Sequence, residues 1–285
     1  MQMLIDKQQR TKDKIIKPDF STKTGREFLA FYLQTKFKQI LQHDKKTDTP
    51  IFKEINPNFI SKFSRRLIEN PQKKFLIGVT GESASGKTTI CKQIKKTSTD
   101  LNFPLEFLSI DNYFNDISEL IKKYGSFDAL RDNGYDVDSP KSFQLELLKE
   151  DLTKLSNGEN IKAPEYLING TGISVPRSIP INAEKFILVE GMAAMYEDIR
   201  DLLDIKIYID TDPKIQKKWF MERATKRNQD EENAIKHWNY VCAAAEKYIR
   251  PSKADADIII NGASSLEYFS QVIEFIHAAT NCFIS

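Results

Sequence analysis

The chain has 285 residues, of which 40% are hydrophobic and 29% charged, which suits one large globular domain or a core domain with an appendage. This composition excludes disordered and collagen-like classes, and no apolar run approaches the roughly 20 residues that a membrane-spanning helix needs. The 42 basic and 40 acidic residues give a net charge of +2, which is too balanced for a protein built mainly to bind nucleic acid.

The three cysteines, Cys91, Cys242 and Cys282, are widely spaced and form no Cys-x-x-Cys pair that could hold zinc. An odd number of separate thiols is typical of a reducing compartment. The first residues have neither the apolar centre of a secretory signal nor the acid-free composition of a transit peptide, since Asp6 and Asp13 lie among the lysines. We therefore expect a cytoplasmic protein.

Positive charge is concentrated in the first quarter of the chain. Residues 1–70 contain 15 Lys and Arg against 8 Asp and Glu, a surplus of +7, so residues 71–285 carry −5. Apolar residues recur at helical spacing over 28–41 and again over 58–69, which predicts two amphipathic helices. We interpret residues 1–72 as a basic helical N-terminal extension that docks on the following domain. Its charge suits a solvated face, an anionic partner or a membrane surface, and its role stays open.

After Pro71, short apolar runs alternate with helical patterns. Near-continuous apolar runs suit strands that are buried on both faces of a parallel sheet, and the helices between them supply right-handed crossovers. The predicted strands are 75–79, 105–110, 186–189, 205–209 and 258–260. The predicted fold class is therefore α/β, with a doubly wound parallel sheet in a domain over residues 73–285.

A longer insertion, about 116–184, separates the second and third predicted strands. Its best predicted helix is 140–157, where Phe143 and four leucines share one face and Gly158 is a suitable residue to end the helix. We expect a further helix over 265–282 to close the domain.

The segment GESASGKT (81–88) matches G-x-x-x-x-G-K-[ST] and stands between a predicted strand and a helical pattern that begins at Lys87. In such a loop, backbone N–H groups and the helix N-terminus surround phosphate groups, Lys87 reaches the outer phosphates, and the Thr88 hydroxyl can bind Mg²⁺. The predicted nucleotide-binding residues are Gly81, Glu82, Ser83, Ala84, Ser85, Gly86, Lys87, Thr88 and Thr89. We thus expect a P-loop NTPase-type sheet, in a protein that uses ATP and Mg²⁺.

The fate of the γ-phosphate is not decided by this loop alone. The chain contains no Asn-Lys-x-Asp element for guanine, which disfavours a GTPase switch and leaves a kinase or an ATPase. The sequence does not fix the preference between ATP and GTP as phosphoryl donor.

Two predicted strands are followed by a carboxylate. Asp111 follows the strand 105–110 and Glu190 follows the strand 186–189, so both should lie at the carboxyl edge of the sheet, where ligands bind in open α/β folds. An acid there can accept the proton of an acceptor hydroxyl or face Mg²⁺. The alternatives are a helix cap for Asp111 and a simple turn at Glu190.

Seven motifs occur in the order typical of one family, and over about 73–262 the chain resembles the uridine kinase and phosphoribulokinase family of P-loop kinases. They are the P-loop, SIDNYF (109–114), DSP (138–140) with Phe143, APEY (163–166), VEG (189–191), YIDTD (208–212), and PSK (251–253) before ADII (256–259). The resemblance is strongest to uridine-cytidine kinases and more distant to bacterial-type pantothenate kinases.

That resemblance implies an ATP-dependent phosphotransferase acting on a primary hydroxyl of a small molecule, with uridine or cytidine first and pantothenate or another metabolite as the alternative. It implies Lys87 and Asp111 as catalytic residues, with Asp111 as the general base, and Asp111, Thr88 and Glu190 around Mg²⁺. An alternative of another class is a P-loop module that hydrolyses ATP slowly and signals through its N-terminal extension.

The resemblance also implies an acceptor site. Asp138 is expected to hold the sugar hydroxyls of the acceptor and Tyr166 to be an acceptor-site aromatic, with Tyr113 and Phe114 as further substrate-binding residues. The alternatives are a cap of the helix at Pro140 for Asp138 and hairpin packing for Tyr166. We expect a small-molecule acceptor, no nucleic acid and no membrane span, while homo-oligomer formation stays open.

The dipeptide Asp212-Pro213 supplies a cap and an N1 proline, which predicts that another helix begins there. In the family, such a helix forms a lid whose arginines close over the triphosphate. The resemblance therefore implies a lid over about 213–230 with Arg223 and Arg227 as catalytic residues; a solvated basic face is the alternative.

Other residues are expected to be structural. Trp219 and Phe220 are predicted to lie in the core rather than to stack on a base. His43, His237 and His277 stand in no nucleophile or metal arrangement in the sequence, so we expect structural or surface positions for them.

The sequence departs from the uridine kinases after Tyr166. The residues LINGTG (167–172) include neither the acid nor the histidine that reads the pyrimidine in those enzymes. A site that loses a hydrogen-bond partner for its substrate loses discrimination, by about 10⁴-fold in favourable cases. The acceptor therefore stays open, with Asn169 or Thr171 as substitutes for the missing contacts.

Overall fold

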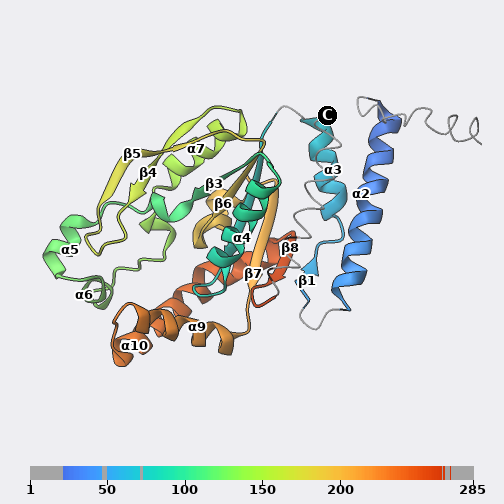
Figure 1. Ribbon diagram of the computed structural model, residues 1–285. Helices are drawn as coiled ribbons and strands as arrows, with labels where there is room; N and C mark the ends of the chain where they lie inside the picture. Colours follow the sequence, from blue (N-terminus) through green and yellow to red (C-terminus); the bar gives the residue numbers. More distant parts are fainter. Residues whose placement is uncertain (1–21, 47–49, 71–72, 265, 267–269, 271–285) are drawn as a thin grey trace, which may run out of the picture.

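The computed structural model describes residues 22–46, 50–70, 73–264, 266 and 270. A six-stranded sheet runs through the molecule with helices on both of its faces (Figure 1). The strand order is β1-β8-β7-β2-β6-β3, and every neighbouring pair is parallel except β1 with β8. Residues 1–21 of the extension, and the predicted closing helix apart from residues 266 and 270, lie outside the described residues.

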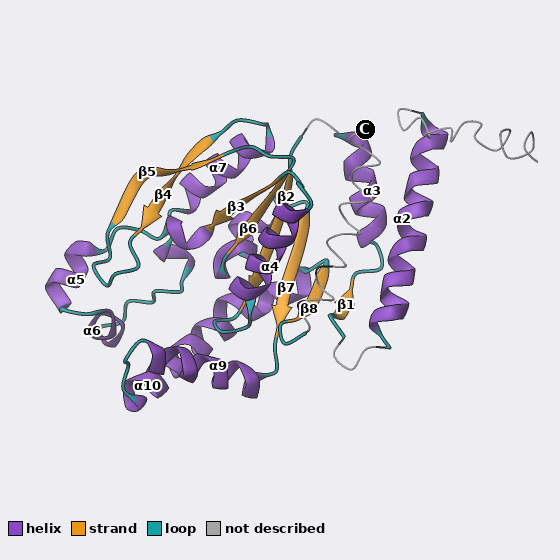
Figure 2. Ribbon diagram, in the orientation of Figure 1, coloured by secondary structure: helices purple, strands orange, loops and turns teal. Residues whose placement is uncertain are grey.

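Figure 2 shows how helices and strands alternate along the chain. The strands of the main sheet are β1 (Phe52–Ile55), β2 (Phe75–Gly81), β3 (Leu105–Ser109), β6 (Phe186–Glu190), β7 (Ile205–Asp210) and β8 (Ile258–Asn261); β4 (Ile161–Tyr166) and β5 (Ser174–Ile181) form a second sheet. The α-helices are α2 (Lys23–Asp44), α3 (Phe59–Glu69), α4 (Lys87–Asp100), α5 (Ser118–Tyr124), α6 (Phe127–Asp132), α7 (Leu145–Ser156), α8 (Glu197–Arg200), α9 (Pro213–Lys226) and α10 (Glu231–Ala244). Short 3₁₀ segments are η1 (Ile110–Tyr113), η2 (Pro140–Ser142), η3 (Met192–Met195) and η5 (Arg250–Asp255), and η4 (Ala245–Ile249) is a π-helical turn. Across the described helices, none combines the length and apolar character that crossing a membrane requires.

All five predicted parallel strands are present, which confirms the α/β doubly wound fold class. The central strand β2 shows why the apolar runs predicted them: Phe75, Leu76 and Val79 are each at most 1% exposed, because helices cover both faces of the sheet. On one face, Val79 packs in a cluster with residues of α3 and α4, whereas Leu76 on the other face packs with the leucines of α7.

The N-terminal extension contributes a strand to the main sheet, which the sequence did not predict. β1 pairs antiparallel with β8, and the buried carboxylate of Asp44, at the end of α2, accepts hydrogen bonds from the backbone N–H groups of Ile51 and Phe52 (2.8 and 3.0 Å). The two predicted helices are present as α2 and α3. The extension therefore docks through a strand as well as through helices.

The predicted helix 140–157 is wrong in its first turn. Pro140–Ser142 is a separate 3₁₀ segment, Phe143 is extended, and α7 begins only at Leu145. In this conformation Phe143 forms an isolated β-bridge with Phe114, and their rings stack with centroids 4.2 Å apart. Burial of the Phe143 ring against Phe114 is thus more favourable than an additional turn of helix before Leu145.

The insertion 116–184 forms a lobe beside the main sheet. It contains α5, α6, α7 and the β4–β5 hairpin, which lie together on the left of Figure 1. In the hairpin Ile161 pairs with Ile181, and Tyr166, at the end of β4, pairs with Ser174. Isoleucines 161 and 181 are buried with the α7 leucines, which anchors the lobe on the domain core.

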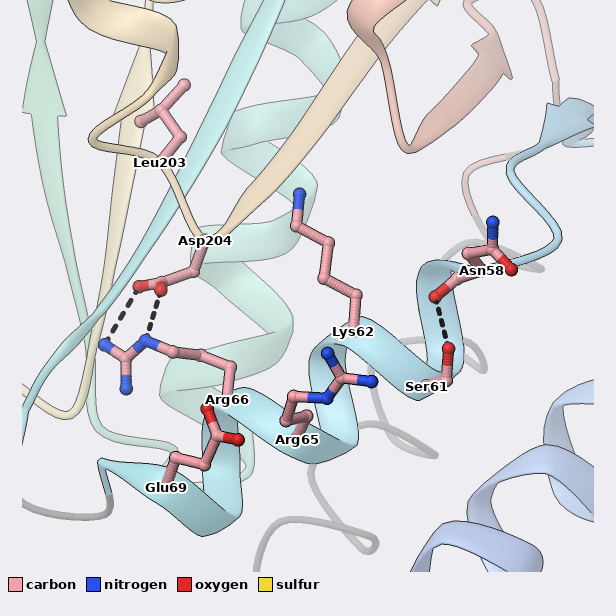
Figure 3. A pocket seen from close by; sticks show the side chains of 8 residues that line it. All are labelled: Asn58, Ser61, Lys62, Arg65, Arg66, Glu69, Leu203 and Asp204. Atoms are coloured by element: carbon pink, nitrogen blue, oxygen red, sulfur yellow. Dashed lines mark hydrogen bonds and ion pairs between the residues drawn. The ribbon is translucent and has the colours of Figure 1, made fainter.

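A charged contact fixes α3 to the start of β7. Arg66 Nε and Nη2 donate to the two carboxylate oxygens of Asp204 (2.5 and 3.3 Å), as Figure 3 shows. The same carboxylate accepts the backbone N–H of Leu76 in β2 (3.0 Å). Because Arg66 is 18% and Asp204 13% exposed, this bidentate pair is largely shielded from water and connects three elements.

We expect Asp204→Ala to lower the free energy of unfolding by about 2 kcal/mol, because it leaves Arg66 and the N–H of Leu76 without their charged partner. Chemical denaturation followed by circular dichroism measures this change. Glu119→Ala removes one partner of the exposed Lys122–Glu119 pair and serves as the control, with no measurable change expected. Equal stability of the Asp204 variant and the wild type would contradict the structural role of the pair.

Candidate active site

The loop between β2 and α4 has the backbone of a phosphate-binding loop. β2 ends at Gly81, and Gly86 is the N-cap residue of α4, which begins at Lys87. Gly86 has a φ of +93°, and a Cβ there would lie 2.9 Å from the carbonyl oxygen of Gly262. Only glycine fits this position. Because α4 begins at the next residue, its N-terminus lies at the carboxyl edge of the sheet, where it can face an anion.

Lys87 folds back over the loop. Its ammonium Nζ donates to the carbonyl oxygens of Gly81 (2.7 Å) and Glu82 (2.9 Å). Burial lowers the pKa of Lys87, and the carboxylates of Glu190 and Asp111 oppose that shift. The ammonium therefore lies in a desolvated place that two acids make electrostatically favourable.

Asp111 and Glu190 face Lys87 from two neighbouring strands. β3 and β6 pair in parallel so that Ser109 is opposite Glu190, and Asp111 follows in η1. Burial raises the pKa of both carboxyls, and Lys87 opposes the shift in each. Asp111 is not the cap of a helix, since Ser109 occupies the N-cap position of η1.

One cavity of about 770 Å³ joins the phosphate loop to the inserted lobe. This volume lies in the range of small-molecule sites. The predicted site residues on its wall are Ser83, Ala84, Ser85, Gly86, Lys87, Thr88, Thr89, Asp111, Phe114, Asp138, Tyr166, Glu190, Arg223 and Arg227. Residues that are far apart in the sequence are thus brought to one surface.

The cavity wall also includes Asp138, Phe114 and Tyr166. The rings of Phe114 and Tyr166 lie 5.2 Å apart between centroids and form an aromatic wall. Burial raises the pKa of Asp138 to about 6, while the nearby Arg131 opposes the shift. Asp138 does not cap the following turn, because Ser139 is the residue at that position.

Tyr113 corrects one prediction. Its side chain is fully buried, its hydroxyl donates to Asp151 of α7 (2.8 Å), and it does not line the cavity. Arg177 of the β4–β5 hairpin donates to the other oxygen of Asp151 (2.6 Å). Tyr113 therefore fastens the inserted lobe to the core and has no surface for direct contact with a substrate.

The predicted lid begins as expected with Asp212, whose side chain accepts the N–H of Lys214 and caps α9. Arg223 and Arg227 both line the cavity, and Arg223 Nη2 donates to the Ser83 hydroxyl in the loop (2.8 Å). Burial and the neighbouring Arg227 both lower the pKa of Arg223. Among the described residues neither guanidinium pairs with a carboxylate, which makes this wall favourable for an anion.

The cavity is also lined by residues that the sequence analysis did not assign to the site, among them Arg131 of α6, Trp219 of α9 and His237 of α10. Trp219 is half-buried and so only partly a core residue, whereas Phe220 lies in the core as predicted. The His237 ring packs edge-on against Phe220 (5.2 Å between centroids), and burial lowers the pKa of His237 to about 4. No motif surrounds these residues, so only the packing of α6, α9 and α10 reveals them.

Asn169 and Thr171 do not replace the missing pyrimidine contacts. They lie in the exposed turn of the β4–β5 hairpin, where Asn169 Oδ1 accepts both the backbone N–H and the hydroxyl of Thr171 (3.1 and 2.5 Å). Neither residue lines the cavity, whereas Ile168 from the same turn does.

Thr88, Asp111 and Glu190, which carry side-chain oxygen atoms, all line the cavity. Mg²⁺ prefers oxygen ligands and usually keeps water and substrate phosphate in its coordination shell. Within the described part of the chain, no group of three or more His, Cys, Asp and Glu could hold a metal ion by itself. The residues present therefore fit a magnesium ion that arrives with a triphosphate rather than an all-protein metal site.

Comparison with known proteins gives matches over the same region. Residues 76–267 match the family model described as "Phosphoribulokinase / Uridine kinase family". Over 188 residues the chain is 34% identical to a uridine kinase of Staphylococcus epidermidis, covering 65% of this chain and 86% of that protein. It is 30% identical over 190 residues to uridine kinase-like protein 5 of Arabidopsis thaliana, covering 65% of this chain but only 38% of that longer protein.

A solved structure from Silicibacter sp. TM1040, described as a candidate fructose transport system kinase, superposes with a TM-score of 0.52 at 16% sequence identity. The superposition covers 68% of this chain and 91% of that one. At this identity the likeness shows a shared fold.

We expect Lys87→Ala to weaken ATP binding at least tenfold, because Asp111 and Glu190 then face the incoming phosphates without an opposing charge. Titration with a fluorescent ATP analogue measures the dissociation constant. Lys92→Ala, at an exposed position on the same helix, is the matched control and should bind like the wild type. Unchanged binding by the Lys87 variant would refute the phosphate-loop assignment.

Proposed function

The chain belongs to the phosphoribulokinase and uridine kinase family, and from this premise we propose that it transfers the γ-phosphoryl group of ATP to a primary hydroxyl of a nucleoside. The observation that carries the proposal is one cavity whose wall combines the phosphate loop with Lys87, the acids Asp111 and Glu190, and the rings of Phe114 and Tyr166 beside the carboxyl of Asp138. Uridine and cytidine are the first acceptors to test. Pantothenate or another small hydroxyl compound is the alternative.

At the donor end, the loop N–H groups and the N-terminus of α4 hold the triphosphate and Lys87 contacts its outer phosphates. Thr88 would hold Mg²⁺, with Glu190 and Asp111 nearby, and the bound ion would supply charge neutralisation for the phosphates. Arg223 and Arg227 of the lid add planar donors where negative charge develops. Within the described part of the chain neither guanidinium forms an ion pair with a carboxylate, which supports that role.

Asp111 is the proposed general base. It lines the same cavity as the loop and Asp138, and burial raises the pKa of its carboxyl, which increases its affinity for the proton of an attacking hydroxyl. Lys87 opposes this shift. In the ionised form such a base takes the hydroxyl proton as the acceptor oxygen bonds to the γ-phosphorus and the bond from that phosphorus to the ADP oxygen breaks.

At the acceptor end, Asp138 can accept hydrogen bonds from two sugar hydroxyls while Phe114 and Tyr166 contact the apolar face of the ligand. His237 and Arg131 are the polar groups that this cavity offers to a base edge in place of residues after Tyr166. The lowered pKa of His237 keeps its imidazole neutral near pH 7, with one donor and one acceptor.

ADP release measured against a panel of nucleosides, pantothenate and sugar phosphates tests the proposal, with ATP and GTP compared as donors. Turnover that rises sharply with uridine or cytidine supports nucleoside phosphorylation. A response confined to pantothenate or a sugar phosphate would establish a different metabolite kinase. Hydrolysis that is independent of every acceptor would instead favour the slow ATP-hydrolysing module.

Asp111→Asn should lower acceptor-dependent kcat by about 10² or more while ATP affinity changes less than threefold, since the amide cannot take the proton. Steady-state kinetics and nucleotide titration separate the two effects. Asp100→Asn, at the exposed end of α4, is the control for loss of a negative charge. Full turnover by the Asp111 variant would exclude this residue as the base.

We expect kcat/KM for the acceptor to fall below about pH 6, because Asp138, whose pKa is raised to about 6, must be ionised to accept hydrogen bonds from two hydroxyls. Protonation of this carboxyl at lower pH removes that capacity, so the loss appears on the acid side only. Profiles from pH 5 to 8 at saturating ATP test this expectation. Asp138→Asn should lower kcat/KM and abolish the fall of kcat/KM below about pH 6. If the variant keeps this fall unchanged, the fall belongs to the titration of another group.

A further inference from the structure

The phosphate loop contains a carboxylate, Glu82, in its first position after β2. The backbone carbonyl of Glu82 faces inward and accepts a hydrogen bond from Lys87 (2.9 Å). Its side chain does not line the cavity and is only 14% exposed. A negative charge this close to a triphosphate site opposes anion binding unless a cation balances it.

Arg250 supplies that cation from a segment 168 residues later in the chain. Its Nε donates to Glu82 Oε1 (2.7 Å) and its Nη2 donates to Glu82 Oε2 (3.1 Å). This is the planar, bidentate geometry that only arginine provides. Among the described residues, Arg250 is the one cation that forms an ion pair with Glu82.

Arg250 is itself held in place. It lies where the π-helical turn η4 passes into η5, and its Nη1 donates to Glu246 one turn earlier. Arg250 donates hydrogen bonds to Glu82 and Glu246, and these bonds raise the pKa of its guanidinium. The contact with Glu246 thus helps to orient the guanidinium that pairs with Glu82.

Two further contacts on the loop are neutral. Gln216 Nε2 donates to the carbonyl oxygen of Ser83 (2.7 Å), and the Thr211 hydroxyl donates to that of Ser85 (2.7 Å). These bonds fix the backbone but leave the charge of Glu82 unchanged. Lys87 holds the backbone carbonyl of Glu82, whereas the charge of the Glu82 side chain is balanced by Arg250.

We propose that Arg250 is a positioning residue for the phosphate loop, which neutralises Glu82 and holds the loop in the conformation that receives the triphosphate. The inference rests on the proposed function only in taking ATP as the ligand of the loop. It predicts that the charge of Glu82 becomes harmful to ATP binding once Arg250 is removed.

Titration of the full chain with a fluorescent ATP analogue tests this prediction. Arg250→Ala should weaken binding about tenfold, with KM for ATP raised and kcat at saturating ATP changed less than threefold. The double variant Arg250→Ala with Glu82→Gln should regain most of that loss, because no unpaired charge then remains. Arg250→Lys should fall between the wild type and the Arg250→Ala variant, since it keeps the charge but not the fork. The loss should also shrink at high ionic strength, where the carboxylate is screened.

Arg200→Ala is the matched control. Arg200 pairs with Asp255 at the other end of η5 (2.8 Å), so its removal loosens the same segment without touching the loop, and ATP binding should be unchanged. Wild-type affinity in Arg250→Ala would overturn the inference. A double variant as weak as Arg250→Ala, or an equal loss at all salt concentrations, would reduce Arg250 to a general structural role. If the wild type binds ATP but phosphorylates no acceptor, the proposed function fails while this binding test still decides the inference.

Discussion

The site depends on a balance of charge in a buried place, where the ammonium of Lys87 faces the carboxylates of Asp111 and Glu190. Burial alone lowers the pKa of the lysine and raises those of the acids, and each sign of charge limits the shift of the other. Arg223 and Arg227 also line this cavity, so its wall carries charges of both signs. A divalent cation that accompanied the phosphates would offset the carboxylates of Asp111 and Glu190, which is the physical reason for expecting a metal-bound nucleotide here.

The parallel sheet is what makes this balance possible. β6 lies between β2 and β3, so the P-loop that follows β2, Glu190 at the end of β6 and Asp111 after β3 emerge side by side at one edge. Each strand is fixed in register by side chains that are buried on both faces. The inserted lobe is anchored to the core by its buried isoleucines and by the hydrogen bond between Tyr113 and Asp151.

The sequence predicted those parts of the fold and site whose signals are local. Apolar runs predicted all five parallel strands, and the motifs predicted which residues follow β2, β3 and β6. β1 was missed because its four residues carry no buried run and are stabilised by pairing with β8. Tyr113 was misplaced because a motif gives the order of residues but not which side chain turns toward the core. His237 lies on a helix whose approach to the cavity is determined only by tertiary packing.

The uneven charge of the chain has a structural counterpart. Basic residues of the extension form ion pairs with acids of the domain that carries the negative excess: Lys53 with Asp210, Lys62 with Asp257, and Arg66 with Asp204. All three acids flank β7 or β8, so the extension is held along one side of the sheet while β1 pairs with β8. The two lysine pairs are partly exposed and contribute little singly, whereas opposite charges on the two surfaces favour docking in this orientation. Part of the positive surplus in the first quarter thus serves assembly of the domain itself. Lys53, for example, pairs with Asp210 at the end of β7, and the next residue, Thr211, donates a hydrogen bond to the phosphate loop.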